Sequence, residues 1–122
     1  MANILIVDDQ PYVGEILLEE LAHEGYQVSS VNDVELVLPH LRDSRTDLVL
    51  LDLYLKGFKG WEVLRGIKRE NPDLPVLILT AYDSFVENPR LSQADGYVVK
   101  SFIEFDKLKQ MIADVLGRKT AL

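Results

Sequence analysis

An apolar run that ends in a single carboxylate constrains the fold of this chain more than any other feature. The stretch LVLLDLYLKG, residues 48–57, opens with successive apolar residues instead of the alternation of a half-exposed strand. Such a run predicts a strand buried on both faces, as in a parallel sheet covered by helices. A carboxylate at its end, Asp52, is costly to desolvate without a partner. Taken alone, Asp52 fits either a solvated strand end or a ligand site.

Short apolar segments alternate with helical patterns along the chain. The predicted strands span residues 4–7, 26–31, 47–53, 75–80 and 96–99. Helical spacing of apolar residues covers residues 11–24, 34–41, 61–67 and 108–116, and the third of these helices should end near Asn71-Pro72. Between the last two strands the pattern is weak and contains Pro89, so a helix there must be short or irregular.

Proline and glycine positions predict where the helices start and stop. Pro11 suits the first turn of a helix and Gly25 suits its end. Pro39 lies inside the second helical pattern and predicts a kink or a short helix. Gly57 and Gly60 predict a loop before the third helix.

Five strand–helix units predict an α/β fold with a parallel, doubly wound sheet and right-handed crossovers. The second strand, residues 26–31, is the most polar and belongs at an edge. This favours the flavodoxin-like order 2-1-3-4-5, with a switch point between the first and third strands. We expect residues 1–122 to form a single domain.

Composition narrows the function classes. The formal net charge of −7 argues against non-specific nucleic-acid binding by this domain. The absence of cysteine excludes a disulfide scaffold or a thiolate metal site. No apolar run approaches the roughly 20 residues of a membrane span, and the first residues lack the basic region of a signal peptide. We therefore expect a cytoplasmic protein that does not contact a membrane.

Polar residues follow four of the predicted strands. They are Asp8 and Asp9, Asp52, Thr80, and Lys100. Because the carboxyl ends of parallel strands share one edge, these five side chains should converge at the switch point. Each of these residues alone could be a helix cap, an ordinary strand residue or a solvated strand end. Five such residues at one edge of the sheet are harder to explain without a shared function.

The charges of this group indicate its chemistry. Three carboxylates and one lysine leave a net negative pocket, which a hard divalent cation with oxygen ligands, such as Mg²⁺, would neutralise. A lysine suits a phosphate oxygen, and a carboxylate can form an aspartyl-phosphate. The set therefore fits phosphoryl transfer onto Asp52.

The chain resembles the receiver domain of two-component response regulators. The likeness runs from ILIVDD through LVLLDLYLKGFKGWEVLR and PVLILTA to DGYVVKS. It implies that Asp52 is the phosphoacceptor, that Asp9 binds Mg²⁺ directly and Asp8 through water, and that Tyr54 supplies a backbone carbonyl to the metal.

The resemblance also implies a switch and partners. Thr80 and Lys100 would bind phosphoryl oxygens, and Tyr97 would turn inward as Thr80 moves toward the phosphate. The phosphodonor would be a sensor histidine kinase or a phosphotransfer protein. The domain would catalyse its own phosphorylation and, slowly, its own dephosphorylation. A downstream protein, which the sequence does not identify, would read the surface around the fifth strand.

The chain departs from the family pattern at four places. Ser101 stands where a proline, often after a cis peptide, usually follows the lysine, and because a cis bond before another residue costs about 3 kcal/mol we do not expect one at Lys100–Ser101. The loop at residues 56–59 lacks the usual proline, and we expect it to be more mobile. The interval from residue 80 to residue 100 is short, which puts the usual output surface in doubt. Tyr54 and Tyr82 lie two residues after Asp52 and Thr80, and we hypothesise that their rings restrict the attacking water.

Three alternatives to this reading can be compared with the sequence. A haloacid-dehalogenase-type phosphatase would need an aspartate where Tyr54 stands. A flavodoxin would need a Ser/Thr/Gly-rich loop after the first strand, where Asp8 and Asp9 repel phosphate. A pseudo-receiver, acting as a phosphorylation-independent interaction module, is the alternative that the site residues do not exclude.

Overall fold

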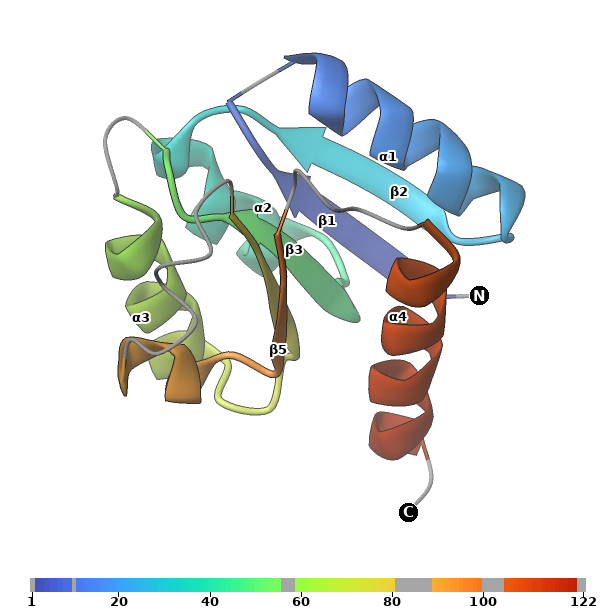
Figure 1. Cartoon of the computed structure of the whole chain (residues 1–122). Coiled ribbons are helices and arrows are strands. Elements are labelled where there is room, and N and C mark those ends of the chain that lie inside the picture. The colour runs from blue at the N-terminus through green and yellow to red at the C-terminus, as the bar shows by residue number, and fades with distance from the viewer. Residues whose placement is uncertain (1, 10, 56–58, 81–88, 100–104, 121–122) are drawn as a thin grey trace.

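A single parallel sheet forms the centre of the protein in a computed structural model (Figure 1), which describes residues 2–9, 11–55, 59–80, 89–99 and 105–120. Its strands are β1 (Asn3–Val7), β2 (Gln27–Val31), β3 (Leu48–Asp52), β4 (Val76–Thr80) and β5 (Gly96–Val99). All neighbours are parallel, and their order is β2-β1-β3-β4-β5. The predicted α/β class and strand order are confirmed.

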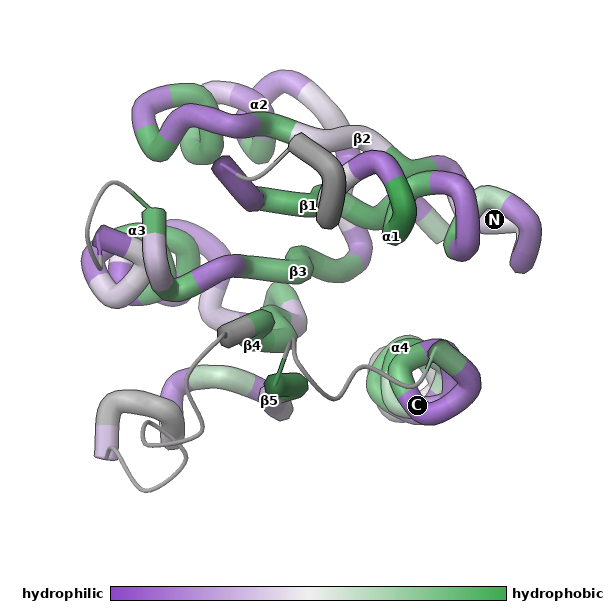
Figure 2. Tube along the Cα trace, turned by 45° about the horizontal axis from the view of Figure 1, so that its top comes forward, coloured by the Kyte–Doolittle hydropathy of each residue, from purple (hydrophilic) through white to green (hydrophobic). Residues whose placement is uncertain are grey.

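Helices cover both faces of this sheet. They are α1 (Pro11–His23), α2 (Val37–Asp43), α3 (Gly60–Glu70) and α4 (Phe105–Thr120). Figure 2 shows α1 and α4 on one side of the strands and α3 on the other. One buried cluster joins the sheet to α2 and α3 through Val37 and Leu64, and a second joins it to α1 and α4 through Leu17 and Ile112.

The burial of β3 explains its unbroken apolar sequence. Every residue of β3 is buried, and successive side chains alternate between the two clusters. Leu48 and Leu50 contact the α1–α4 cluster, whereas Val49 and Leu51 contact the α2–α3 cluster. By contrast, β2 is an edge strand that leaves Gln27 and two serines exposed, as its polar sequence predicts.

The predicted helix boundaries are mostly confirmed. Helix α1 begins at Pro11, and Gly25 follows it with a φ of 91°, in the left-handed region that glycine tolerates. Pro39 lies in a helix of only 7 residues, preceded by a short 3₁₀ helix, η1 (Val34–Leu36). Some boundaries differ by a few residues. Gly60 is the first residue of α3 and does not lie in the preceding loop, α2 continues to Asp43, and α4 is longer at both ends than its apolar pattern.

The connection between β4 and β5 is only partly described. Its described part contains a 3₁₀ helix, η3 (Pro89–Gln93), and residues 81–88 lie outside the described residues. The prediction of a short or irregular fourth helix agrees with the part that is described. Among the described segments, no helix has the length and apolarity needed to cross a membrane.

Two aspartates fasten the amino edge of the sheet, which is the edge where the strands begin. Asp47 precedes β3, and its Oδ2 accepts a hydrogen bond of 2.8 Å from the backbone amide of Asn3. Asp95 precedes β5, and its Oδ2 accepts from the amide of Val76 at 2.8 Å and from Lys68 Nζ at 2.9 Å. Each of these carboxylates therefore joins segments that are distant in sequence.

Candidate functional site

The carboxyl edge of the sheet, where the strands end, brings three aspartates together. Val7 of β1 and Leu51 of β3 are partners in register. The next residue along each strand is an aspartate, so Asp8 and Asp52 lie side by side. Since β1 also pairs with β2, this is the switch point at which ligands of open α/β sheets bind.

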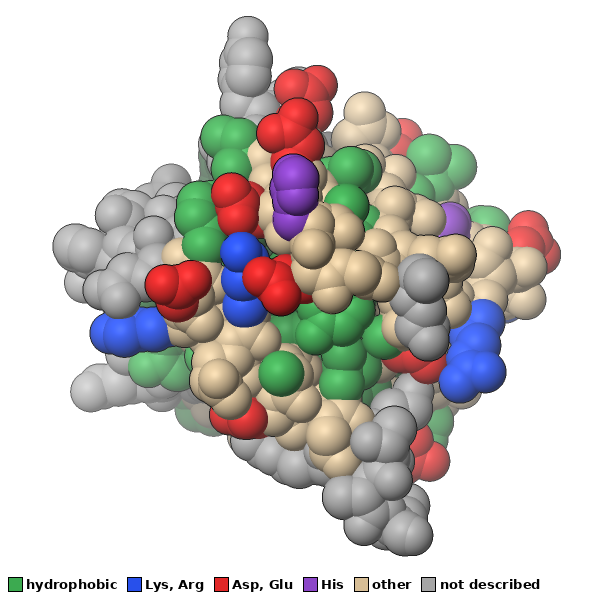
Figure 3. All heavy atoms as spheres, turned by 90° about the vertical axis from the view of Figure 1, so that its right-hand side faces the viewer, with side chains coloured by type: hydrophobic (Ala, Val, Ile, Leu, Met, Phe, Trp, Pro, Cys, Tyr) green, Lys and Arg blue, Asp and Glu red, His purple; other side chains and the backbone are tan. Residues whose placement is uncertain are grey.

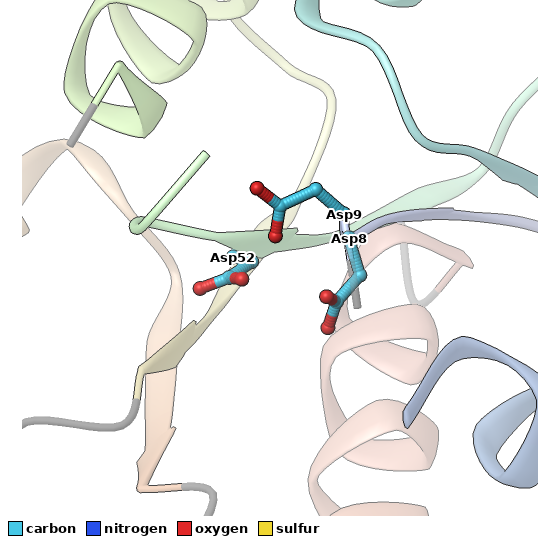
Figure 4. Close-up of side chains that lie close together, drawn as sticks. All are labelled: Asp8, Asp9 and Asp52. Atoms are coloured by element: carbon cyan, nitrogen blue, oxygen red, sulfur yellow. The ribbon is translucent and has the colours of Figure 1, made fainter. Parts of the chain in front are cut away.

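The three carboxylates form a compact cluster (Figure 4). One oxygen from each of Asp8, Asp9 and Asp52 lies within 4.8 Å of the others. Asp8 and Asp52 are buried, with 6% and 2% of their surface exposed, whereas Asp9 is exposed. The cluster thus has two buried members and one that reaches solvent.

The cluster fits a small divalent cation. Two unit charges 4.8 Å apart repel by about 3 kcal/mol at an effective dielectric constant near 20. A cation between the carboxylates would convert this repulsion into attraction. All three donors are carboxylate oxygens, and hard cations such as Mg²⁺ prefer oxygen ligands. Asp8 and Asp9 come from one strand end and Asp52 from its neighbour, so the fold itself gathers the donor set.

A backbone amide helps to fix the orientation of the Asp52 carboxylate. The Tyr54 amide donates a hydrogen bond of 3.0 Å to Asp52 Oδ1. The segment that follows β3 is anchored by Leu53 and Leu55, whose side chains are buried on either side of Tyr54. Tyr54 itself is 43% exposed.

The other predicted site residues are placed less completely. Thr80 is the last residue of β4 and pairs in register with Val99 of β5, so Lys100 directly follows the partner of Thr80. The Thr80 side chain and all of Lys100 lie outside the described residues. Tyr97 lies on β5 opposite Ile78, with 43% of its surface exposed.

The family departures noted in the sequence fall largely outside the described residues. Ser101, Tyr82 and residues 56–58 are among the undescribed positions. The expectations about the Lys100–Ser101 peptide, the mobility of the 56–59 loop and the ring of Tyr82 therefore stay predictions.

Gly60 has a part in this site that the sequence pattern did not indicate. Its amide donates a 3.0 Å hydrogen bond to the carbonyl of Leu53, directly after the Asp52 strand. A Cβ on Gly60 would lie 2.5 Å from Leu53 Cα and 2.6 Å from the Asp52 carbonyl oxygen. In the sequence, Gly60 is simply a glycine in the predicted loop before the third helix, and such glycines also occur for unrelated reasons.

Comparisons with known sequences agree with this geometry. The family model described as response regulator receiver domain matches residues 4–113. A probable transcriptional regulatory protein, TcrX from Mycobacterium tuberculosis, is 36% identical over 82% of this chain and 44% of its own length. The DNA-binding response regulator MtrA from Mycolicibacterium smegmatis is 38% identical over 95% of this chain and 50% of its own length. The chain spans about half the length of these curated relatives.

Solved structures agree as well. The response regulator protein TrrA from Thermotoga maritima, in complex with Mg²⁺-BeF, is 38% identical, with a TM-score of 0.87 over 94% of this chain and 99% of TrrA. A structure of the histidine kinase ThkA in complex with TrrA gives 39% identity and a TM-score of 0.86 over 95% of this chain and 99% of the matched chain. A CheY-like receiver domain protein from Methanospirillum hungatei, 24% identical with a TM-score of 0.91, covers 99% of this chain and 98% of its own, and shares its fold.

Proposed function

Because this chain belongs to the response regulator receiver domain family of two-component signalling, we propose that it accepts a phosphoryl group on Asp52 from a sensor histidine kinase or a phosphotransfer protein. The observation that carries this proposal is the cluster of Asp8, Asp9 and Asp52 at the switch point of the sheet. The kinase complex of TrrA, which is 39% identical to this chain, supports a kinase as the donor.

The site residues divide the work of the transfer. A carboxylate oxygen of Asp52 attacks the phosphorus atom, the P–N bond of the donor phosphohistidine breaks, and its electron pair stays on the imidazole nitrogen. The Tyr54 amide orients the Asp52 carboxylate through its bond to Oδ1. The Thr80 hydroxyl and the Lys100 ammonium each bind a phosphoryl oxygen.

Magnesium is the cofactor that the cluster fits. Asp8, Asp9, Asp52 and the backbone carbonyl of Tyr54 would hold it. When bound, Mg²⁺ would supply positive charge that offsets both the carboxylates and the phosphoryl oxygens. The Mg²⁺-BeF complex of the similar protein TrrA supports this assignment.

Phosphorylation then changes a protein-binding surface. Thr80 pairs with Val99 on β5, and Tyr97 lies two residues before Val99 on the same strand. The added charge would bias the positions of Thr80 and Tyr97 and thereby the surface around β5.

Residues 1–122 act as one receiver domain in the cytoplasm. The net charge of −7 supports a downstream protein instead of nucleic acid as the direct target of this domain.

Intact mass spectrometry tests the proposal directly. The protein is incubated with acetyl phosphate, with and without Mg²⁺, beside an Asp52→Asn variant. We expect one added phosphate in the wild type with Mg²⁺ only, and none in the variant. A parallel receiver domain of known activity verifies the labelling conditions. No labelling under those conditions would contradict the proposal and favour a pseudo-receiver that binds its partner without phosphorylation.

A further inference from the structure

The first turn of α3 is bound to the segment that carries the phosphoacceptor. The Gly60 amide donates to the Leu53 carbonyl at 3.0 Å, and the Lys59 amide donates to the Leu55 carbonyl at 2.9 Å. The first amides of a helix have no partner within the helix, and Lys59 offers no side-chain cap. The two carbonyls therefore serve as the cap of α3 and hold Tyr54 between two anchored peptides.

This contact requires glycine because of proximity. A Cβ at Gly60 would lie 2.5 Å from both Cα and the carbonyl oxygen of Leu53, and 2.6 Å from the carbonyl oxygen of Asp52. All three neighbours are backbone atoms, which cannot turn aside as a flexible side chain can. The φ of Gly60 is not in the left-handed region, so backbone conformation does not explain this glycine.

Any side chain at Gly60 must therefore separate α3 from the backbone after β3. That backbone is held on its other side, since the Leu53 amide donates to the Leu79 carbonyl of β4 at 3.2 Å. The buried side chains of Leu53 and Leu55 also resist movement. A displacement would reach Tyr54, whose amide binds Asp52 Oδ1 and whose carbonyl we assign to the metal.

We infer that Gly60 is a positioning residue of the phosphoacceptor site. Its missing side chain lets α3 hold the Asp52–Leu55 backbone in the geometry that binds Mg²⁺ and presents the Asp52 carboxylate. This inference rests on the proposed function, because it explains how that site is shaped.

A matched pair of alanine variants tests the inference. Gly66 lies in the same helix, where a Cβ would meet only Leu38 Cδ1 at 3.7 Å, an ordinary contact. Gly66→Ala should therefore keep Mg²⁺ binding and raise the melting temperature, because alanine is the better helix former. Gly60→Ala should weaken Mg²⁺ binding by about tenfold or more, as loss of outer support does at metal sites, and should slow labelling by acetyl phosphate.

The double variant separates positioning from stability. Gly60→Ala combined with Gly66→Ala should recover melting temperature while Mg²⁺ affinity stays low. Mg²⁺ affinity is measured by isothermal titration calorimetry without phosphodonor, at a temperature where circular dichroism shows each variant folded. Mg²⁺ affinity in the double variant equal to that of the wild type would overturn the inference. A double variant that stays unfolded even in the cold would also overturn it, since Gly60 would then be needed for folding itself.

The wild type distinguishes this inference from the proposed function. A wild type that neither binds Mg²⁺ nor takes up phosphate would refute the proposed function, and the inference with it. A wild type that does both, beside a double variant with normal Mg²⁺ binding, would refute only the role of Gly60.

Discussion

Aspartates lie at both edges of the sheet, but their surroundings differ. At the amino edge, Asp47 and Asp95 each accept a hydrogen bond from a backbone amide of another segment. At the carboxyl edge, Asp8, Asp9 and Asp52 have oxygens within 4.8 Å of one another. The amino edge therefore uses carboxylates to join strands, whereas the carboxyl edge concentrates negative charge in one place.

This difference between the two edges indicates that the aspartates at the amino edge stabilise the fold, whereas those at the carboxyl edge serve the proposed function. A carboxylate that accepts backbone amides strengthens the fold, because its removal leaves those amides unpaired. Carboxylates that face one another weaken the fold until a cation binds between them. Substitutions of the same chemistry should therefore have opposite effects at the two edges.

The largest stability effect is expected at the amino edge. Asp47→Ala should lower the free energy of unfolding by about 2–3 kcal/mol, because it removes the buried carboxylate that accepts a charge-assisted hydrogen bond from the partly buried amide of Asn3. Urea denaturation measures the change. Arg45→Met is the control, since Arg45 contacts Asp47 but its side chain is 82% exposed, and it should change stability by less than about 0.5 kcal/mol. Equal losses in both variants would show that Asp47 stabilises the fold through its ion pair with Arg45 and not through its hydrogen bond to the Asn3 amide.

A smaller effect of opposite sign is expected at the carboxyl edge. In the presence of EDTA, Asp52→Asn should raise the free energy of unfolding by about 1–2 kcal/mol, because it removes one of the repelling charges. Saturating Mg²⁺ should stabilise the wild type, by about 2.7 kcal/mol at a concentration 100 times its Kd, and should stabilise the variant less.

The matched control for this prediction is the same substitution at the amino edge. Asp95→Asn removes the charge that faces Lys68 and should lower stability by about 1 kcal/mol with or without Mg²⁺. A loss of stability for Asp52→Asn in EDTA, similar to that of Asp95→Asn, would remove the distinction between the two edges.

The exposed ring at the carboxyl edge should affect the lifetime of the phosphate more modestly. Tyr54→Ala should speed dephosphorylation by roughly three- to tenfold, which corresponds to at most about 1.4 kcal/mol of barrier, because the ring no longer restricts water. Tyr82→Ala should act in the same direction. Loss of labelled protein over time, followed by mass spectrometry, measures the rate. Unchanged rates in both variants would contradict the shielding hypothesis.

The smallest effect is expected where neither edge is involved, between α1 and α4. Lys109 Nζ lies 3.0 Å from Glu20 and 3.2 Å from Glu24. Figure 3, which views the right-hand side of Figure 1, shows acidic side chains close to basic ones on that face of the protein. Hydrogen bonds to Glu20 and then to Glu24 raise the pKa of Lys109. The folded state therefore keeps this proton more tightly than the unfolded state.

The sign of the resulting pH dependence follows from that difference. The contribution of Lys109 to stability is complete below the ordinary pKa of lysine and is lost as the pH rises through the raised value. Lys109→Met should reduce the alkaline loss of stability and should matter little in about 1 M salt, where exposed charges are screened. Thermal unfolding of the wild type and the variant from neutral to alkaline pH, at low and high salt, measures how much stability is lost as the pH rises. An alkaline loss that Lys109→Met leaves unchanged would assign it to another group, such as Tyr26, whose pKa is raised by burial and by Glu24.

The sequence predicted the sheet because its strands differ strongly in pattern. The unbroken apolar run of β3 required burial on both faces, and the polar β2 required an edge, which together order the strands. The strand assignments also predicted that Asp8, Asp9 and Asp52 lie close together, because parallel strands all end at the same edge of the sheet. The roles of Thr80 and Lys100 stay predictions, because their side chains lie outside the described residues.

Contacts between distant segments escaped the sequence pattern. Asp47 flanks a strand as Asp52 does, and only the fold reveals that its partner is Asn3, 44 residues away. The closeness of Gly60 to Leu53 depends on how α3 docks on the sheet, and no local periodicity encodes it. Local patterns therefore predicted the elements, while the atoms that join them required the three-dimensional structure.

The complete burial of β3 has a consequence for amide hydrogen exchange. The backbone amides of a central, fully buried strand exchange only when the whole domain opens, whereas those of exposed edges exchange through local fluctuations. Asp52 stands at the end of the strand that should be the slowest to exchange. The residue proposed to receive the signal is thus fixed to the most persistent part of the molecule, and any response to phosphate must come from the faster-exchanging segments around it.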